Sequence, residues 1–291
     1  MSLDGIVLVD KPEGPTSHDV VASARRIFGT RKVGHAGTLD PMATGMLVLG
    51  IGKATRLLGY FSANDKEYLA TIRLGQTTNT DDAQGEFIDQ KSTENITDEN
   101  ILNSVRDFRG PISQVPSAIS AIKIDGKRAY ARVRDGEEIK LPAREVLIQD
   151  FEIISVTHNA QTIDVAVRVV CSAGTYIRAL ARDLGEKLGV GGHLVELRRT
   201  RSGKFSQMRP LVDIENTPTL IELPDALRMT FPIVEVSGDD VKRARNGVRI
   251  QLPVEAPTGL VGVFTKEGEV ISLSENKNSE LIPLVVFQVD Q

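Results

Sequence analysis

The chain has 291 residues, of which 41% are hydrophobic, and its formal net charge is −4. These values are typical of a globular protein and exclude a disordered or fibrous chain. At this length we expect about two domains, with roughly three quarters of the unfolded surface buried on folding. The single cysteine, Cys171, excludes an internal disulfide and a cysteine-rich zinc site, and it favours a reducing, cytoplasmic location.

The charges are segregated along the chain. Residues 168–209 hold nine basic and three acidic residues, a net of +6, and residues 123–144 hold seven and four, a net of +3. Residues 76–107 hold two basic and eight acidic residues, a net of −6. Local positive charge of this size is compatible with a polyanionic partner despite the negative total. The N-terminus predicts neither a signal peptide nor a membrane anchor, and no stretch approaches the roughly 20 apolar residues of a membrane span.

Periodicity predicts alternating strands and helices over the first two thirds of the chain. Residues 75–95 are polar and acidic, which indicates a surface loop. The Asp-Gly pair at 125–126 predicts a tight hairpin. The expected strands are 6–12, 46–51, 67–74, 144–155 and 163–171, and the expected helices are 16–28, 54–61, 97–108 and 175–188.

The pattern of the sequence changes near residues 223–232, after which only short apolar segments follow, and we place a domain boundary there. Short apolar segments follow at 233–236, 259–265, 270–273 and 281–289, with a tight turn at 266–268. This pattern predicts a small β-barrel of about sixty residues.

The segment GHAGTLDPMATG contains the strongest chemical signal. Asp40 lies on a loop flanked by glycines, and Pro41 biases its backbone towards an extended conformation. A carboxylate fixed in this way can act as a nucleophile or a base. From the residues alone, the more common explanation is a turn in which Asp40 is an Asx cap.

The longer motif GHAGTLDPMATGMLVLGIGKATRL resembles the signature of the TruB family of tRNA pseudouridine synthases. The resemblance covers most of residues 5–210. The C-terminal part of the chain, FPIVEV followed by GLVGVFTKEGEVISL, is similar to a PUA domain. Four further segments carry the likeness: KPEGPTSHDVV, KEYLATIRLGQTTNTDDAQG, QVPSAISAIKIDGKRAYARVRDGEE and CSAGTYIRALARDLGEKLGVGGHLVELRRTRSG.

The resemblance implies an α+β catalytic domain over residues 1–230, built on a mixed, largely antiparallel sheet. An RNA-binding thumb is implied near residues 113–144, and a PUA-like β-barrel over 231–291. The implied reaction isomerises the uridine at position 55 of the tRNA T loop to pseudouridine, and it needs no cofactor, metal or redox change. The sequence has no phosphate-binding or dinucleotide-binding glycine motif. The implied partner is the tRNA T stem-loop, with no membrane, no obligate protein partner and a monomeric chain.

The resemblance assigns the catalytic aspartate to Asp40. It makes Tyr68 the stacking partner of the flipped base, and the phenol of Tyr68 would also move the C5 proton. It pairs Arg178 with the Asp40 carboxylate. The alternatives are a half-buried strand tyrosine and an arginine that contacts solvent or phosphate. The resemblance also places Tyr176, Leu197 and Lys11 in the pocket, although Leu197 can equally be a core residue and Lys11 a turn lysine.

For RNA binding the resemblance indicates His35, which would help to hold the T loop open, and Asp82, which would orient an arginine or a base. The alternatives are a structural histidine and a surface acid. Two basic runs are expected to contact phosphates, unless they form solvated charged faces. They are Lys123, Lys127, Arg128, Arg132 and Arg134 in the first run, and Arg198, Arg199, Arg201 and Lys204 in the second.

Two other functions stay open. The same basic surfaces suit a non-catalytic tRNA-binding or tRNA-folding chaperone, and clamping of tRNA would precede catalysis in any case. A guide-RNA-dependent relative of the family would share the catalytic half, but such proteins usually carry long basic extensions, and this sequence shows no basic tail.

Overall fold

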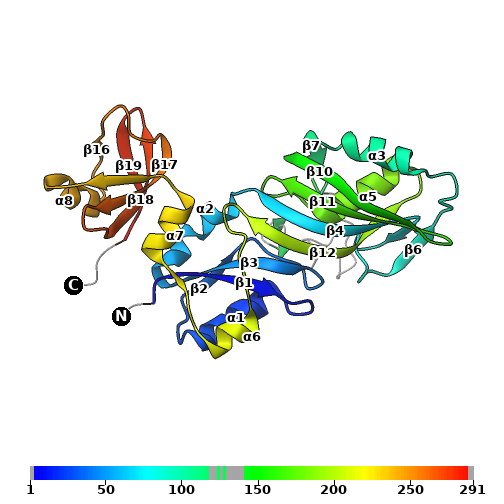
Figure 1. Ribbon diagram of the computed structural model, residues 1–291, viewed down its shortest axis with the longest axis horizontal. Coiled ribbons are helices and arrows are strands. Elements are labelled where there is room, and N and C mark those ends of the chain that lie inside the picture. The colour runs from blue at the N-terminus through cyan, green and yellow to red at the C-terminus, as the bar shows by residue number, and fades with distance from the viewer. Residues whose placement is uncertain (1–2, 118–122, 125–126, 129–140, 288–291) are drawn as a thin grey trace. The chain divides into compact units, whose positions relative to one another are not determined.

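The computed structural model describes residues 3–117, 123–124, 127–128 and 141–287 (Figure 1). The chain forms two compact units. The first, which we call the Asp40 unit, comprises Asp40–Gly45 and Ala63–Ser202. The second, the terminal unit, comprises Met1–Leu39, Met46–Ser62 and Gly203–Gln291.

A five-stranded antiparallel sheet is the centre of the Asp40 unit, in the order β12-β4-β11-β10-β7 (Figure 1). On β4 every second residue is buried, which is the period of a strand with one face against a core. Thr44 and Gly45, the first residues of β3 (Thr44–Ile51), pair in parallel with Arg198 and Arg199 of β12. The strands are β4 (Lys66–Leu74), β7 (Gly110–Gln114), β10 (Arg144–His158), β11 (Ile163–Cys171) and β12 (Gly192–Ser202).

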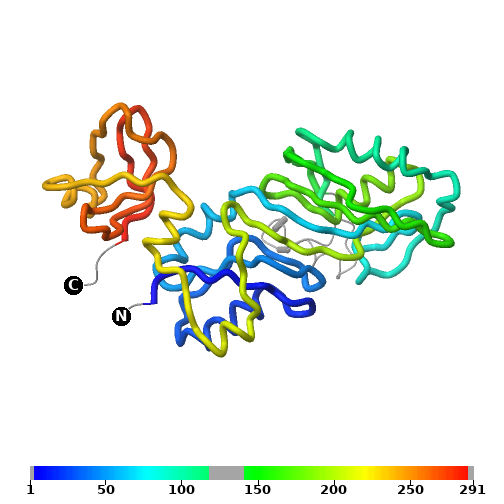
Figure 2. Tube along the Cα trace, in the orientation of Figure 1, coloured from blue at the N-terminus to red at the C-terminus, as the bar shows by residue number. Residues whose placement is uncertain are grey.

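Two helices pack on this sheet. Helix α5 (Ile177–Lys187) packs against β12 and β4 and buries Leu180 and Leu184, while α3 (Asp98–Arg106) packs against β10 and α5. Each fully buried leucine side chain contributes roughly 1.5–3 kcal/mol. Thr97 caps α3 by accepting a hydrogen bond of 3.2 Å from the Asn100 backbone, an interaction of about 1 kcal/mol. Figure 2 shows the chain running from α5 back into β12 beside β4.

Two short hairpins complete the Asp40 unit. Strands β5 (Gln76–Thr78) and β6 (Phe87–Gln90) pair with each other, as do β8 (Lys123–Ile124) and β9 (Lys127–Arg128). The second pair is the hairpin that the Asp-Gly signal predicts, although its two turn residues lie outside the described part of the chain.

The N-terminal half of the terminal unit is a small mixed sheet in the order β13-β1-β3. The pair of β1 with β13 is parallel, β14 pairs antiparallel with β1, and β2 pairs antiparallel with β3. The strands are β1 (Gly5–Lys11), β2 (Val33–Ala36), β13 (Arg209–Pro210) and β14 (Ile221–Glu222). The helices are α1 (Ser17–Ile27), the 3₁₀ helix η1 (Gly52–Leu57), α2 (Leu58–Ser62), α6 (Leu211–Asn216) and α7 (Leu223–Thr230).

The C-terminal part of the same unit is a five-stranded sheet in the order β15-β17-β18-β19-β16. Phe264 and Leu273 of this sheet share a core with Phe61, Phe205 and Leu227. A second small core lies around Val261 and Val263. The elements are β15 (Ile233–Val236), α8 (Asp239–Arg245), β16 (Ile250–Gln251), β17 (Gly259–Thr265), β18 (Val270–Lys277) and β19 (Glu280–Val286).

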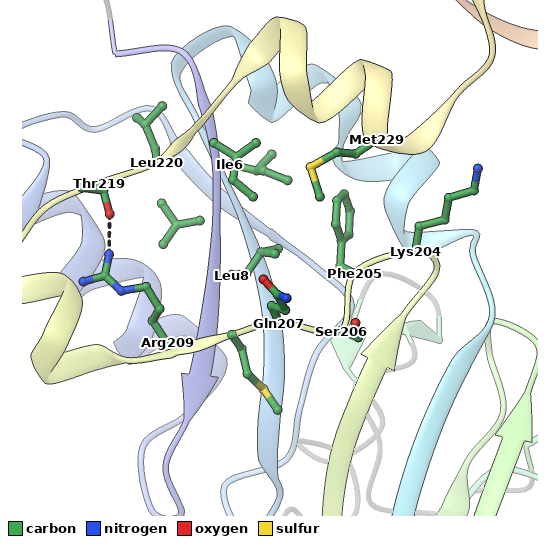
Figure 3. Close-up of a pocket in the computed structure, with 13 residues that line it drawn as sticks. Ile6, Leu8, Lys204, Phe205, Ser206, Gln207, Arg209, Thr219, Leu220 and Met229 are labelled. Atoms are coloured by element: carbon green, nitrogen blue, oxygen red, sulfur yellow. Dashed lines mark hydrogen bonds between the residues drawn. The ribbon is translucent and has the colours of Figure 1, made fainter.

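A cavity of 570 Å³ opens in the terminal unit (Figure 3). Its walls are mainly apolar side chains such as Ile6, Leu8 and Phe205. The Arg209 guanidinium donates a hydrogen bond to Thr219, shown as a dashed line in Figure 3. Asp40 and the pocket residues expected around it do not line this cavity, so the candidate active site lies elsewhere.

The fold class predicted from the sequence is confirmed: the protein is α+β, with a mixed, largely antiparallel sheet and a small β structure at the C-terminus. Two local predictions are wrong, and two strands were not predicted. The helix expected over 54–61 is a 3₁₀ turn followed by the short α2. The surface loop expected over 75–95 contains the β5–β6 hairpin and a buried aspartate. The two unpredicted strands are β7, which begins at a Gly-Pro pair, and β12, whose C-terminal half is rich in arginine.

Candidate active site

Asp40 begins a short turn that leads into β3. The Ala43 backbone N–H donates to the Asp40 carbonyl over 3.1 Å, and Met42 and Ala43 are buried. The Asp40 side chain keeps 39% of its surface exposed. The turn therefore anchors its backbone through buried neighbours and leaves the carboxylate accessible to a substrate.

Gly45 sets the close approach of this turn to β12. Its φ is +96°, and a Cβ atom built at this position would lie 2.2 Å from the Arg199 carbonyl oxygen. Only glycine adopts this backbone without strain. The absence of a side chain at Gly45 thus lets the Asp40 turn pair with β12 at Arg198 and Arg199.

We expect Gly45→Ala to lower the free energy of unfolding by about 2 kcal/mol or more, because a positive φ at a non-glycine residue costs about 1–3 kcal/mol before any clash is counted. Gly59→Ala is the matched control, since Gly59 lies in α2 with nothing within 4 Å of its added Cβ. Alanine there should be neutral or slightly stabilising. Urea unfolding of the two variants measures both values, and equal effects would contradict the role assigned to Gly45.

Arg178, in the first turn of α5, joins two aspartates. Its Nε lies 3.0 Å from Asp40 Oδ2, and its Nη1 lies 3.5 Å from Asp82 Oδ2. Nη1 also donates to the Thr80 carbonyl oxygen over 2.9 Å. The Arg178 side chain is only 6% exposed. A buried guanidinium needs such partners, and their fixed directions orient the Asp40 carboxylate.

Asp82 is held by the loop between β5 and β6. Its side chain is 8% exposed, and its Oδ1 accepts hydrogen bonds from Thr80 Oγ1 at 2.6 Å and from the Gln84 backbone at 3.1 Å. Asp82 is therefore not a surface acid. Its contact with Arg178 matches the expectation that it orients an arginine.

Tyr68 on β4 is buried and lies between Val169 of β11 and Arg199 of β12 in the register of the sheet. Burial raises the pKa of the Tyr68 phenol, the Arg199 guanidinium lowers it in part through its charge and a hydrogen bond, and the Asp40 carboxylate adds to the increase. The net increase keeps the phenol protonated at neutral pH. Leu197 lies two residues from Arg199 and is also buried. Tyr68, Leu197 and Asp40 all lie in the Asp40 unit.

Tyr176 precedes α5 and is fixed through its backbone. The buried side chain of Gln114 accepts from the Tyr176 N–H at 2.8 Å and donates to the Tyr176 carbonyl at 3.1 Å. The Arg144 guanidinium lies 5.5 Å from the centre of the Tyr176 ring, within the range of a cation–π contact. Gln114 is a positioning residue that the sequence did not reveal, because a single glutamine between prolines gives no chemical signal.

Lys66 is a buried cation on the same face of β4 as Tyr68. Burial and the nearby charge of Arg199 lower the pKa of Lys66 to about 8, while Cys171 and Asp65 act in the opposite direction. Burial raises the pKa of the adjacent Cys171 thiol to about 11, so the thiol is protonated and unreactive at neutral pH. The Lys66 ammonium donates to the Asn64 carbonyl oxygen.

Lys66 predicts a pH dependence of stability. Its folded pKa of about 8 lies below the ordinary 10.5, so the unfolded chain binds more protons between these values and stability should rise with pH there. Below about pH 8 both states are protonated and the destabilisation is fully present. Lys66→Met lacks this effect. Urea unfolding from pH 7 to 10.5 tests this. The unfolding free energy of wild type should rise relative to that of Lys66→Met as the pH increases, and a constant difference between the two would refute the assignment.

Two predicted site residues belong to the terminal unit. Lys11 is fully buried, and its ammonium donates to the carbonyl oxygens of Pro12 and Pro15, each at 2.8 Å. These contacts match the alternative of a turn lysine, and the place of Lys11 in the pocket stays a prediction. His35 lies on β2, with its ring edge-on to His18 at 5.4 Å between centroids.

The arginines of the second basic run point to opposite faces of β12. Arg199 is 1% exposed and faces the same side as Tyr68, so it is not part of a solvent-exposed basic surface. Arg198 and Arg201 pair with Leu69 and Glu67, on the other face. The Arg201 guanidinium lies 2.8 Å from an Asp65 carboxylate oxygen. Of the first run, Lys123, Lys127 and Arg128 lie on β8 and β9, while Arg132 and Arg134 fall outside the described residues.

Comparison with known proteins connects this geometry to a family. Residues 25–177 match the model described as TruB family pseudouridylate synthase, N terminal domain, and residues 178–228 match the tRNA pseudouridylate synthase B C-terminal domain. The chain belongs to the TruB family of pseudouridylate synthases. It is 48% identical over 290 residues to the tRNA pseudouridine synthase B of Thermobifida fusca, with 98% of each chain covered. It is 50% identical over 296 residues to the protein of the same name from Paenarthrobacter aurescens, covering 98% of this chain and 95% of that one.

Solved structures agree with this membership. The chain is similar to a protein in the structure of an H/ACA RNP bound to a substrate RNA containing 2'-deoxyuridine, with 26% identity and a TM-score of 0.72. It is also similar to a protein in a Cbf5-Nop10-Gar1 complex, with 27% identity and a TM-score of 0.71. In both cases 98% of this chain and 84% of the other are covered. Within the described residues, none of the helices is long and apolar enough to span a membrane.

Proposed function

We propose that this protein isomerises uridine to pseudouridine in tRNA, at position 55 of the T loop, with Asp40 as the attacking carboxylate. The observation that carries the proposal is the Asp40 carboxylate itself, which is oriented by a buried Arg178 at 3.0 Å and is still 39% exposed. The relatives are named tRNA pseudouridine synthase B, which supports tRNA as the substrate.

The reaction exchanges one bond from the sugar for another. The bond between uracil N1 and ribose C1′ breaks, the uracil turns over, and C5 forms the new bond to C1′. A single carboxylate can serve this chemistry, either by attacking the sugar or the base or by first taking a proton from the sugar. Arg178 holds the Asp40 carboxylate in one orientation, so little reorganisation is needed when the substrate arrives.

The target uridine must leave the stacked T loop before Asp40 can reach it. Extrusion of a base costs a few kcal/mol, which contacts in the pocket must offset. Tyr68 and Leu197, both buried in the Asp40 unit, offer an aromatic face and an apolar edge for the flipped uracil. We therefore assign them to base binding, with Tyr176 at the edge of the same site.

Recognition of the rest of the tRNA is assigned to charge and shape. Arg198 on β12 and the basic residues of β8 and β9 are the side chains that we propose for phosphate contacts. The chain has thirteen aromatic residues other than histidine and no tryptophan, which makes an extended stacking platform a poor alternative. His35 is proposed to support the opened T loop.

A tRNA-folding chaperone is the alternative activity, and the two can coexist in one chain. Phosphate clamping alone needs exposed cations, and it gives no reason to bury Arg178 between Asp40 and Asp82. This arrangement favours catalysis. A guide-RNA-dependent activity is the less favoured hypothesis, because the relatives of about 50% identity carry the name of a tRNA enzyme.

The direct test is tritium release from an unmodified tRNA transcript labelled at C5 of uridine. Purified protein is added without cofactor, guide RNA or a second protein. Release of one equivalent per tRNA, lost when position 55 is changed to cytidine, is the expected result. No release, with binding in a gel shift retained, would favour the chaperone, and release that persists in the cytidine-55 transcript would place the modified uridine elsewhere.

A further inference from the structure

Arg199 is a buried cation whose place in the site calls for a function. Its side chain is among the largest that are fully buried in the described part of the molecule, with 1% of the residue exposed. Removing a guanidinium from water is costly unless fixed partners compensate. Arg199 also acts on Lys66, because its charge contributes to the lowered pKa of that lysine. Packing alone would be served better by an apolar side chain.

The sheet directs Arg199 to Tyr68. The two residues are opposite each other in the antiparallel β12–β4 pair, and the Arg199 guanidinium lies close enough to the Tyr68 phenol to lower the phenol pKa through its charge and its hydrogen-bonding groups. Strand alternation turns Arg198 to the other face, and an irregularity in β12 lies between Arg199 and Arg201. On the other side of β12, Gly45 lies against the Arg199 backbone. Arg199 is therefore fixed between the turn that carries Asp40 and the strand that carries Tyr68.

We infer that Arg199 is a positioning residue for the last proton transfer: its guanidinium holds the Tyr68 phenol oxygen and stabilises the negative charge that this oxygen carries after it releases its own proton and before it receives the C5 proton. This inference rests on the proposed function. A hydrogen bond from a charged donor strengthens as its acceptor becomes charged, so the contact stabilises the transition state more than the resting phenol.

The proton balance defines what the pair must do. After C5 has joined C1′, C5 carries both the sugar carbon and its hydrogen, and the ring has a double bond between N1 and C6. The C5–H bond breaks, its electron pair forms the C5–C6 double bond, and the former N1–C6 pair moves to N1. The phenol proton of Tyr68 first passes to the Asp40 carboxylate, which the sugar has just released, and from there to N1. The Tyr68 oxygen, now negatively charged, then takes the C5 proton and becomes a phenol again.

The charges around Tyr68 suit this transfer. The Asp40 carboxylate raises the pKa of the Tyr68 phenol, whereas Arg199 lowers it. Without Arg199, the phenol oxygen would have to release a proton in an apolar site beside a carboxylate. The Arg199 guanidinium offsets both burial and Asp40 at the moment when the oxygen is most negative.

The test compares Arg199→Met, Arg199→Lys and wild type on tRNA transcripts that carry hydrogen or deuterium at C5 of uridine. Single-turnover formation of pseudouridine should fall about 10- to 100-fold in Arg199→Met, the loss expected for a hydrogen bond to a charged group. The hydrogen-to-deuterium rate ratio should rise above that of wild type, because the C5 step then limits the rate. Arg199→Lys keeps the charge and should restore part of the rate and lower the ratio.

The control is Arg168→Met, which removes an arginine from the other face of the sheet, where Arg168 pairs with Glu67 at 2.7 Å. It should leave the isotope ratio of wild type unchanged. Thermal unfolding and tRNA binding are measured on all variants, and Arg199→Lys carries the test if Arg199→Met does not fold. An active wild type with an unchanged ratio in the Arg199 variants would overturn the inference. An inactive wild type would overturn the proposed function instead.

Discussion

Asp40→Asn is expected to lower pseudouridine formation by at least about 10⁴-fold, because an amide cannot attack the sugar and cannot take a proton from it. The variant should fold and bind tRNA nearly as well as wild type. The Asp40 side chain is the exposed member of its ion pair, and the asparagine oxygen can still accept a hydrogen bond from Arg178. Tritium release from C5 measures the reaction, and a gel shift measures binding.

The matched control is Asp89→Asn, the same change at an exposed residue of β6. It should keep full activity. If Asp40→Asn released tritium at the wild-type rate, Asp40 would be a turn residue and the attacking group would lie elsewhere. If a tRNA-folding assay showed that Asp40→Asn keeps all folding activity while modification is lost, the chain would have both functions.

The sequence predicted the elements of the fold better than the direction of their side chains. The alternation of residues 67–74 predicts a strand, and the structure has β4 at Lys66–Leu74. The Thr97 cap predicts the start of α3. These signals are local: an alternating pattern or a cap is complete within a few neighbouring residues.

Arg199 shows why the basic run was misread. Three arginines within four residues look like one charged surface, but on a strand alternate side chains face opposite sides. β12 buries Arg199 beside Tyr68 and turns Arg198 and Arg201 to the other face. Whether a given arginine is buried depends on partners far away in the sequence, and no pattern within 198–201 contains them.

Asp82 and Lys11 show the same limit in opposite ways. Asp82 lies in an acidic stretch that looks solvated, but a distant arginine on α5 gives it a buried partner. Lys11 is expected in the pocket, and its ammonium donates to two carbonyl oxygens of its own turn. In both cases the decisive contacts are hydrogen bonds of single atoms, which leave no periodic trace. The resemblance of motifs placed Asp40 and Arg178 in one site, and their distance came only from the structure.

Arg178→Met should cost about 3–5 kcal/mol of stability, because removing one partner of a buried ion pair leaves the other charge unpaired. The Asp82 side chain is 8% exposed and cannot recover its lost partner through solvent. The double variant Arg178→Met/Asp82→Asn should regain part of this loss, since the remaining amide can still accept from Thr80 and Gln84. Both variants should be inactive, because Asp40 has lost the donor that orients it.

Arg73→Met is the control for Arg178→Met. Arg73 makes a two-bond contact with Asp164, at 2.7 and 2.8 Å, but the two side chains are 33% and 23% exposed. Solvent can hydrate Asp164 once Arg73 is gone, so the loss should stay near 1 kcal/mol. Urea unfolding compares the two variants. Equal losses would mean that burial does not set the strength of the Arg178–Asp82 pair.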